Sequence, residues 1–193
     1  LKTSDKTDPS DTSDMSNIVD ATTKSAIDDS AWAMIGKDPY HTSFAANIAG
    51  PGPTATISWR FDADPGYAIS QPVADAEGNV YFGAANGLSG RIIKLAENGS
   101  KSWEFPTNVS IGMPAVLSDK TVYFGRVGAG GVLAFTALNS NGSKSWDYDN
   151  ASTVKAVAVS SKGEPHFTYS SGTDKLAVLN TDGSEKIPPI NDA

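Results

Sequence analysis

The sequence Ser58-Trp59-Arg60-Phe61 returns as Ser102-Trp103-Glu104-Phe105 and again as Ser145-Trp146-Asp147-Tyr148. The three tryptophans lie 44 and 43 residues apart. A fixed period of roughly 40–45 residues is typical of propellers, in which each repeat forms one four-stranded blade. The sequence therefore predicts an internal repeat that is built from β-strands.

Two further series keep the same period. Residues 78–83, 120–125 and, more loosely, 163–168 share an apolar strand centred on Tyr81-Phe82, Tyr123-Phe124 and His166-Phe167. Residues 97–100, 140–143 and 181–184 carry Asn-Gly or Asp-Gly, which favour the positive φ angles of two-residue hairpin turns. In the third copy Ile187 replaces the tryptophan, so this outer strand is expected to be degraded or cut short.

Each repeat resolves into four short strands with apolar residues on alternate positions, for example at about 68–75, 79–85, 91–96 and 101–106. Such a sheet leaves both faces wet unless other sheets stack on it. We therefore predict an all-β fold of about three four-stranded antiparallel propeller blades, at about 58–101, 102–144 and 145–187. Together with a leading segment at 29–57, these blades make up a propeller segment at 29–193.

Residues 1–28 are polar and acidic, with almost no large apolar side chain before Ile18. A segment of this composition is predicted to be a disordered linker, because it cannot bury enough surface to offset its ordering entropy. Aspartates recur there at every third position, but the segment lacks the glycine turn and the terminal glutamate of a calcium-binding EF-hand loop. The aspartates are Asp5, Asp8, Asp11 and Asp14.

Composition and charge exclude several classes of function. Lysine and arginine total 15 against 22 aspartates and glutamates, a net charge of −7, so no basic surface for nucleic acid is expected. The absence of cysteine excludes disulfides, thiolate catalysis and cysteine-ligated metal sites. No run of about 18 apolar residues is present, so we expect no membrane-spanning helix.

The stretch from Trp32 to Thr42, followed by Gly50-Pro51 and Trp59-Arg60-Phe61, resembles the leading segment of pyrroloquinoline-quinone (PQQ)-like repeat propellers. The Val-Tyr-Phe-Gly and Asn-Gly-Ser-x-x-Trp elements resemble the inner strand and outer turn of that family, over about 30–187. Quinoprotein dehydrogenases in this family hold PQQ on the axis of an eight-bladed ring, usually with calcium, an aspartate base and often a vicinal disulfide. Other members bind no cofactor. No residue of this chain matches a catalytic role, so the resemblance implies a non-enzymatic propeller without a cofactor or metal.

The repeated aromatic residues are candidates for packing between blades rather than for sugar stacking, because residues at the same place in every repeat build the repeat. They are Trp59, Trp103, Trp146, Tyr81, Phe82, Tyr123 and Phe124. The non-repeating positions Asp62, Asp64, Tyr67, 126–131 and His166 are better candidates for function. The only other histidine, His41, is expected to make a structural loop contact, and His166 to lie on a strand.

Four Asn-x-Ser sequons fall in predicted turns and are candidate glycosylation sites in an exported protein. Their asparagines are Asn98, Asn108, Asn141 and Asn150.

Three blades are too few to close a ring, and an open arc exposes apolar faces. The arc is therefore expected to belong to a longer protein, to be completed by further copies, or to be covered by segment 29–57. The function expected is a non-catalytic binding or scaffolding module that acts through protein–protein contacts outside the cytoplasm: at the cell surface, secreted or periplasmic. The alternatives are a subunit of a cell-surface filament or layer, and a fragment of a PQQ-dependent dehydrogenase. The expected partner is another protein or further copies of the chain, in a homo-oligomer or filament.

Overall fold

The computed structural model describes Ala33, Met34, Lys37 and residues 56–87, 89–107, 112–127, 133–149, 153–170 and 173–191. All regular elements in these residues are β-strands, as the strand-and-turn pattern of the sequence predicts. They are β1 (Ala68–Ile69), β2 (Val73–Ala74), β3 (Val80–Ala85), β4 (Gly90–Leu95), β5 (Lys101–Thr107), β6 (Ala115–Val116), β7 (Val122–Val127), β8 (Leu133–Leu138), β9 (Lys144–Tyr148), β10 (Thr153–Val159), β11 (Pro165–Ser170), β12 (Asp174–Leu179) and β13 (Glu185–Asn191). None of the described residues forms a helix that is long and apolar enough to cross a membrane.

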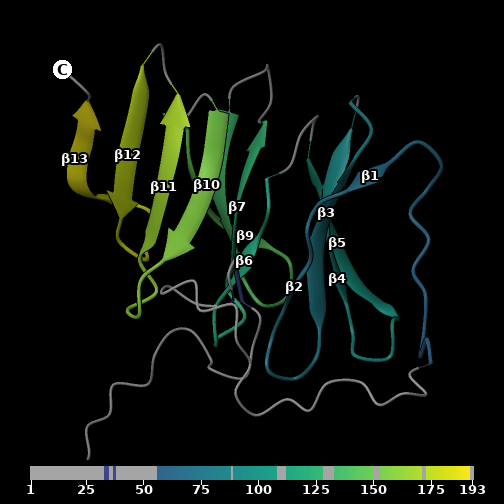
Figure 1. Cartoon of the computed structure of the whole chain (residues 1–193). Helices are drawn as coiled ribbons and strands as arrows, with labels where there is room; N and C mark the ends of the chain where they lie inside the picture. Colours follow the sequence, from purple (N-terminus) through teal and green to yellow (C-terminus); the bar gives the residue numbers. More distant parts are fainter. Residues whose placement is uncertain are drawn as a thin grey trace, which may run out of the picture.

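The strands form three antiparallel sheets that stand side by side (Figure 1). In blade 1, β1 and β2 both pair with β3 and act as one interrupted inner strand, followed by β4 and β5. Blade 2 has the order β6-β7-β8-β9, and blade 3 has the order β10-β11-β12-β13. The prediction of an all-β fold with about three four-stranded antiparallel sheets is confirmed, and the sheets do not close into a ring within the described residues.

The Asn-Gly and Asp-Gly sequences join the third and fourth strands of each blade. Gly99, Gly142 and Gly183 have φ angles of 83°, 83° and 86°, which an L-residue with a side chain adopts only under strain. The amide of Ala96 bonds to the carbonyl of Ser100, and the amide of Gly99 bonds back to Ala96. The glycine is thus the left-handed residue of a longer loop with a bulge in the ladder, not part of the two-residue turn that the sequence predicted.

Face-to-face stacking of the blades produces a core that spans both contacts between blades, and a second, smaller cluster lies on the far side of blade 1 around Phe82 and Ile93. Phe135 of blade 2 stacks on Phe167 of blade 3 with ring centroids 4.2 Å apart, and Phe105 of blade 1 meets Phe124 of blade 2 edge-on at 6.2 Å. Gly125 lets blade 3 come close, since a Cβ atom added there would lie 2.5 Å from the Cβ of Val154. The core therefore lies mainly between sheets, as expected for stacked blades.

The observed sheets do not begin and end where the predicted blades do, because the prediction counted each repeat from one tryptophan to the next. The sheets span 68–107, 115–148 and 153–191, so Trp103 lies on the last strand of blade 1 and Trp146 on the last strand of blade 2. A repeat that starts at a tryptophan consequently straddles two sheets. The outer strand β13 has seven residues and pairs with β12, so the third copy's outer strand is not cut short. Its ladder does have two register shifts, against one in each of the other two outer pairs.

Segment 1–28 and most of 29–57 lie outside the described residues. Ala33 and Met34 of the leading segment are anchored on blade 2. Ala33 and Met34 are buried, and the carbonyl of Ala33 accepts a hydrogen bond from the amide of Val116 on β6 at 2.9 Å.

Candidate functional site

Trp103 and Trp146 each join one blade to the next. The indole N–H of Trp103 on β5 donates to the carbonyl of Ser140 in blade 2 at 3.1 Å, and that of Trp146 donates to Thr181 in blade 3 at 2.9 Å. A Cβ atom on Gly142 would lie 2.7 Å from the indole of Trp103. Glycine is therefore needed at these turn positions for two reasons: it adopts the positive φ angle, and it leaves room for the indole that packs on it. These aromatic rings are packed into the joints between blades.

The repeated tyrosines and phenylalanines point to opposite sides of each sheet, because neighbours along a strand alternate. Tyr81 contacts Trp103, on the side that faces blade 2, and its hydroxyl donates to Asp75 at 2.8 Å. Tyr123 donates across the next joint to the carbonyl of Gly163 at 3.1 Å. Burial, with a smaller contribution from Asp119, raises the pKa of Tyr123 to about 12. Phe82 and Phe124 pack toward the preceding segment or blade.

Asp75 is a buried carboxylate that the sequence analysis did not single out. It accepts hydrogen bonds from the backbone and side-chain amides of Asn79 and from the Tyr81 hydroxyl. The ammonium nitrogen of Lys120 in blade 2 lies 3.7 Å from Oδ2 of Asp75, and it also forms an ion pair with Glu77. Burial alone would raise the pKa of Asp75, but these hydrogen bonds and the ammonium of Lys120 outweigh it and hold the pKa below its ordinary value.

Lys120 adopts a φ of 71° at the turn position that glycine holds in the other two repeats, at Gly78 and Gly163. A lysine there costs backbone strain, and it reaches across the joint to Asp75 and Glu77. The sequence did contain a sign of the buried carboxylate: Asp75 opens the turn of blade 1, four residues before Asn79.

Arg126, one of the non-repeating candidates, belongs to a polar cluster within blade 2. Its guanidinium donates to Thr136 at 2.7 Å and to Asp147 at 2.8 Å, and Lys144 also reaches Asp147. Burial opposes ionisation of Asp147, but the bonds from Lys144, Thr136 and Arg126 prevail and lower its pKa. Arg126 is therefore committed to the packing of blade 2, while 128–131 lie outside the described residues.

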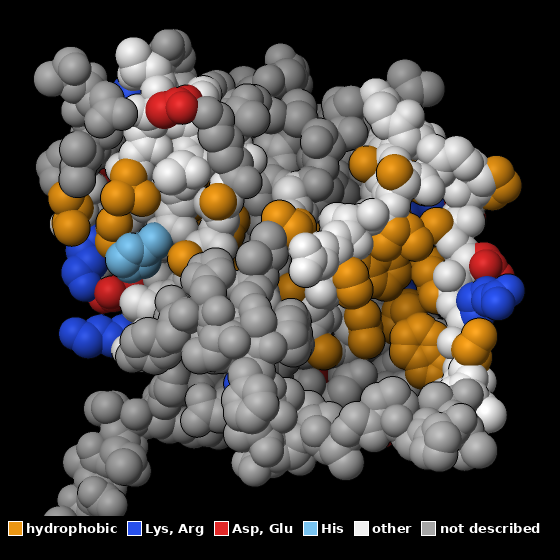
Figure 2. Space-filling model, in the orientation of Figure 1, with side chains coloured by type: hydrophobic (Ala, Val, Ile, Leu, Met, Phe, Trp, Pro, Cys, Tyr) orange, Lys and Arg blue, Asp and Glu red, His pale blue; other side chains and the backbone are white. Residues whose placement is uncertain are grey.

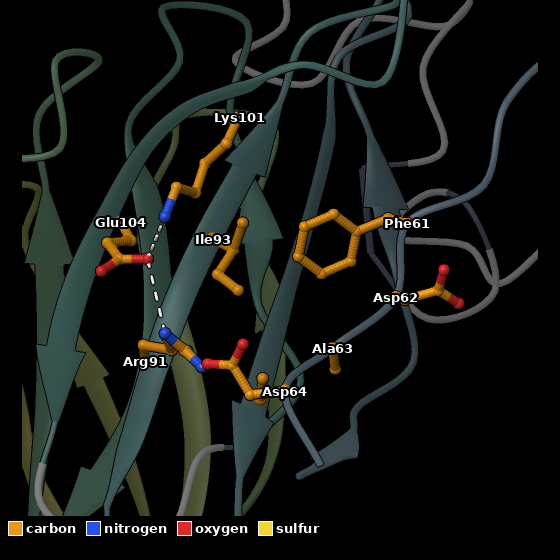
Figure 3. Close-up of a pocket in the computed structure, with 9 residues that line it drawn as sticks. Phe61, Asp62, Ala63, Asp64, Arg91, Ile93, Lys101 and Glu104 are labelled. Carbon is orange, nitrogen blue, oxygen red and sulfur yellow. Dashed lines mark hydrogen bonds and ion pairs between the residues drawn. The ribbon is translucent and has the colours of Figure 1, made fainter.

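Two other candidates, Asp64 and Tyr67, line or flank a hollow of about 150 Å³ on blade 1 (Figure 3). The guanidinium of Arg91 forms an ion pair with Asp64. Its Cζ atom lies 4.6 Å from the centre of the Tyr67 ring, and its Nη1 atom lies 3.7 Å from Oε2 of Glu104. Lys101 in turn binds Glu104 at 2.7 Å. Both cations of this hollow are held by Asp64 and Glu104, so no positive charge is left for a ligand, and the third carboxylate, Asp62, lies exposed at the rim.

The outward face of blade 3 is different, since an apolar hollow of about 210 Å³ lies open on it. Its lining includes Ala156, Ala158, His166, Thr168 and Leu176. The ladder places these residues beside one another, with His166 opposite Ala158 and Thr168 opposite both Ala156 and Leu176. Figure 2 shows hydrophobic side chains above and beside the histidine, and Lys or Arg and Asp or Glu side chains at its outer edge. We call these five residues, with Ile187, the open face.

Comparison of the sequence with models of protein families and with curated proteins found no match. The open face is therefore interpreted from its own chemistry. The buried Nε2 atom of His166 has no hydrogen-bond partner among the described residues. Within that part of the chain, no group of histidine, cysteine, aspartate or glutamate side chains is placed to hold a metal ion. His41 and the aspartates of segment 1–28 lie outside it.

Two sequon asparagines, Asn98 and Asn141, are exposed in the turns beneath Trp59 and Trp103. Each side-chain carbonyl accepts a hydrogen bond from the serine hydroxyl of its own sequon at 2.7 Å. Asn108 and Asn150 lie outside the described residues.

Proposed function

We propose that this chain is a non-catalytic PQQ-like propeller module that binds or scaffolds another protein through its surface. The observation that carries the proposal is the open face of blade 3. An apolar, solvent-exposed sheet face marks a site of interaction, because burying it removes apolar area from water at about 25 cal/mol per Å².

The two inner joints show what this kind of face does when it is covered. Ile92 lies opposite Gly83, Phe135 opposite Gly125, and Leu176 opposite Thr168, so the three side chains occupy one structural position. Ile92 and Phe135 are 0% exposed because the next blade packs on them, whereas Leu176 is 40% exposed. The open face thus resembles the sides of blades 1 and 2 on which the next blade packs, but no described blade packs on it.

The partner that suits this surface is a protein with a flat, mainly apolar face. No aspartate, glutamate, lysine or arginine lines the hollow of the open face, so shape and apolar area, rather than ion pairing, would provide affinity.

The test is a face-specific loss of binding by the full chain. We expect Leu176→Asp to reduce recovery of a stoichiometric protein partner from the producing cells by about tenfold or more, since a buried unpaired carboxylate costs over 1.4 kcal/mol. Affinity purification with identification and quantification of the partner by mass spectrometry measures this loss. Ile69→Asp is the matched control, because Ile69 is 48% exposed on blade 1, away from the open face.

Three outcomes would contradict the proposal: equal recovery with both variants, no partner with the unmodified chain, or alcohol oxidation with a dye acceptor after reconstitution with PQQ and calcium. If sedimentation identifies the partner as a second copy, the open face is an interface between copies. Circular dichroism of both variants checks that they fold.

We also propose that the module acts outside the cytoplasm, at the cell surface, secreted or in the periplasm. The exposed positions of Asn98 and Asn141 on turns support this, because a glycosylating enzyme reaches such sites without unfolding the chain. The intact mass of the protein from its natural source is expected to exceed the sequence mass by whole hexose residues. Asn98→Gln and Asn141→Gln should each remove part of the excess. A mass equal to that of the bare chain would remove this support.

A further inference from the structure

Segment 57–61 makes the contacts of an outer blade strand, although it belongs to none of the three sheets. It runs along the side of blade 1 that faces away from blade 2 (Figure 1). None of its residues takes part in a β-ladder with other described residues.

The first shared contact is that of the tryptophan. The indole N–H of Trp59 donates to the carbonyl of Glu97 at 2.7 Å, and a Cβ atom on Gly99 would lie 2.7 Å from its ring. Trp103 and Trp146, which lie on the outer strands β5 and β9, make the same contact with the next turn. Trp59 therefore docks on blade 1 as though a blade preceded it.

The second shared contact lies two residues further along. Phe61 meets Phe82 edge-on, with centroids 5.4 Å apart and planes at 62°. The corresponding pairs at the two inner joints have centroids 6.2 and 5.8 Å apart and planes at 67° and 72°. Those pairs are Phe105 with Phe124 and Tyr148 with Phe167. Side-chain spacing and direction in 57–61 thus follow the pattern of a strand.

The missing element is a neighbouring third strand. In blade 1, Trp103 on β5 pairs with Lys94 on β4, and in blade 2, Trp146 on β9 pairs with Ala137 on β8. Segment 57–61 has no such neighbour among the described residues, and Ile57 at its start is 74% exposed. An unpaired strand edge presents a row of N–H and C=O groups that another strand can satisfy.

We infer that segment 57–61 is the fourth strand of a further blade, and that its third strand comes from polypeptide other than residues 56–191. A second copy of the chain is a poor donor, because β4, β8 and β12 of that copy are each already paired with their own outer strand. The occupant is therefore a repeat sheet that lacks its own outer strand. This inference concerns the opposite end of the arc from the open face and does not rest on the proposed function.

Hydrogen–deuterium exchange of the full chain, at low concentration, tests the first half of the inference. The amides of 59–61 should exchange at least about tenfold faster than those of 103–105 and 146–148, which are held in ladders. The three segments have the same tryptophan pattern, so 103–105 and 146–148 serve as internal controls for 59–61 in the same measurement. Slow exchange at 59–61 in the monomer would overturn the inference, because the edge would then be occupied already.

A synthetic hairpin that copies residues 79–96 tests the second half. It carries the second and third strands of a blade without the fourth, and we expect it to slow exchange at 59–61 by about tenfold at saturation. The matched control is the same hairpin with N-methylated amides on the edge that β5 would occupy, which should give no protection. The inference fails if neither hairpin protects 59–61, if both protect it equally, or if protection rises with chain concentration alone, which would indicate pairing between copies.

Discussion

Trp103→Ala is expected to lower the free energy of unfolding by about 2–4 kcal/mol, somewhat less than for a fully buried aromatic residue, because the indole is half-buried against the core. The indole fills the joint between blades 1 and 2, where it contacts Tyr81 at a centroid distance of 6.0 Å and covers Gly142. Its N–H bond to the carbonyl of Ser140 is lost as well. Removal of the ring therefore weakens the contact between two sheets rather than one sheet alone.

Urea unfolding followed by circular dichroism measures this effect. Trp103→Phe is the matched control: it keeps an aromatic ring but has no donor for Ser140, so it should lose less than the alanine variant. Gly142→Ala places a Cβ atom 2.7 Å from the indole, and it should be less destabilising when Trp103 is already alanine. A loss below about 1 kcal/mol for Trp103→Ala would mean that the joint does not depend on the docked ring.

Asp75→Ala is expected to be similarly costly, at about 3–5 kcal/mol, because it leaves buried donors without their acceptor. The Tyr81 hydroxyl and the Asn79 amides lose their partner, and Lys120 loses one of its two carboxylates. The double variant Asp75→Ala with Tyr81→Phe should recover part of the loss, since it removes one stranded donor.

The carboxylate also makes stability depend on pH. The folded pKa of Asp75 lies below its unfolded value of about 3.9, so its contribution is present above that value and is lost as pH falls through the folded pKa. The unmodified chain should therefore lose stability as pH drops below about 4, and Asp75→Asn should show a shallower decline. Asp147 has a lowered pKa too, so some decline remains in the variant. Equal slopes in urea unfolding at a series of pH values would show that Asp75 is not linked to folding.

Local pattern was sufficient to predict most strands. Ranges 79–85, 91–96 and 101–106 match β3, β4 and β5 closely, because alternating apolar residues and turn signals depend only on near neighbours. The inner strand expected at 68–75 is broken into β1 and β2. Blade limits were harder to predict, since the tryptophan of each repeat belongs to one sheet and packs on the next.

The candidate surface could not be predicted in the same way. Leu176 is an apolar residue on a strand, as are Ile92 and Phe135, and nothing local distinguishes the exposed one from the two buried ones. Asp62, Asp64 and Arg126 stood out because they do not repeat, yet Asp64 and Arg126 form ion pairs within the fold. His166 was singled out for the same reason, and it does lie on the open face.

The sequence by itself determined the strands, their turns and their grouping into repeats of about 43 residues, because strand period and turn chemistry are local properties. Only the tertiary structure decided which face of each sheet is covered, since coverage depends on what stacks there. For the same reason, it alone showed that Trp59 and Phe61 dock like residues of an outer strand with no neighbouring strand among the described residues, and that Leu176 is exposed where Ile92 and Phe135 are buried.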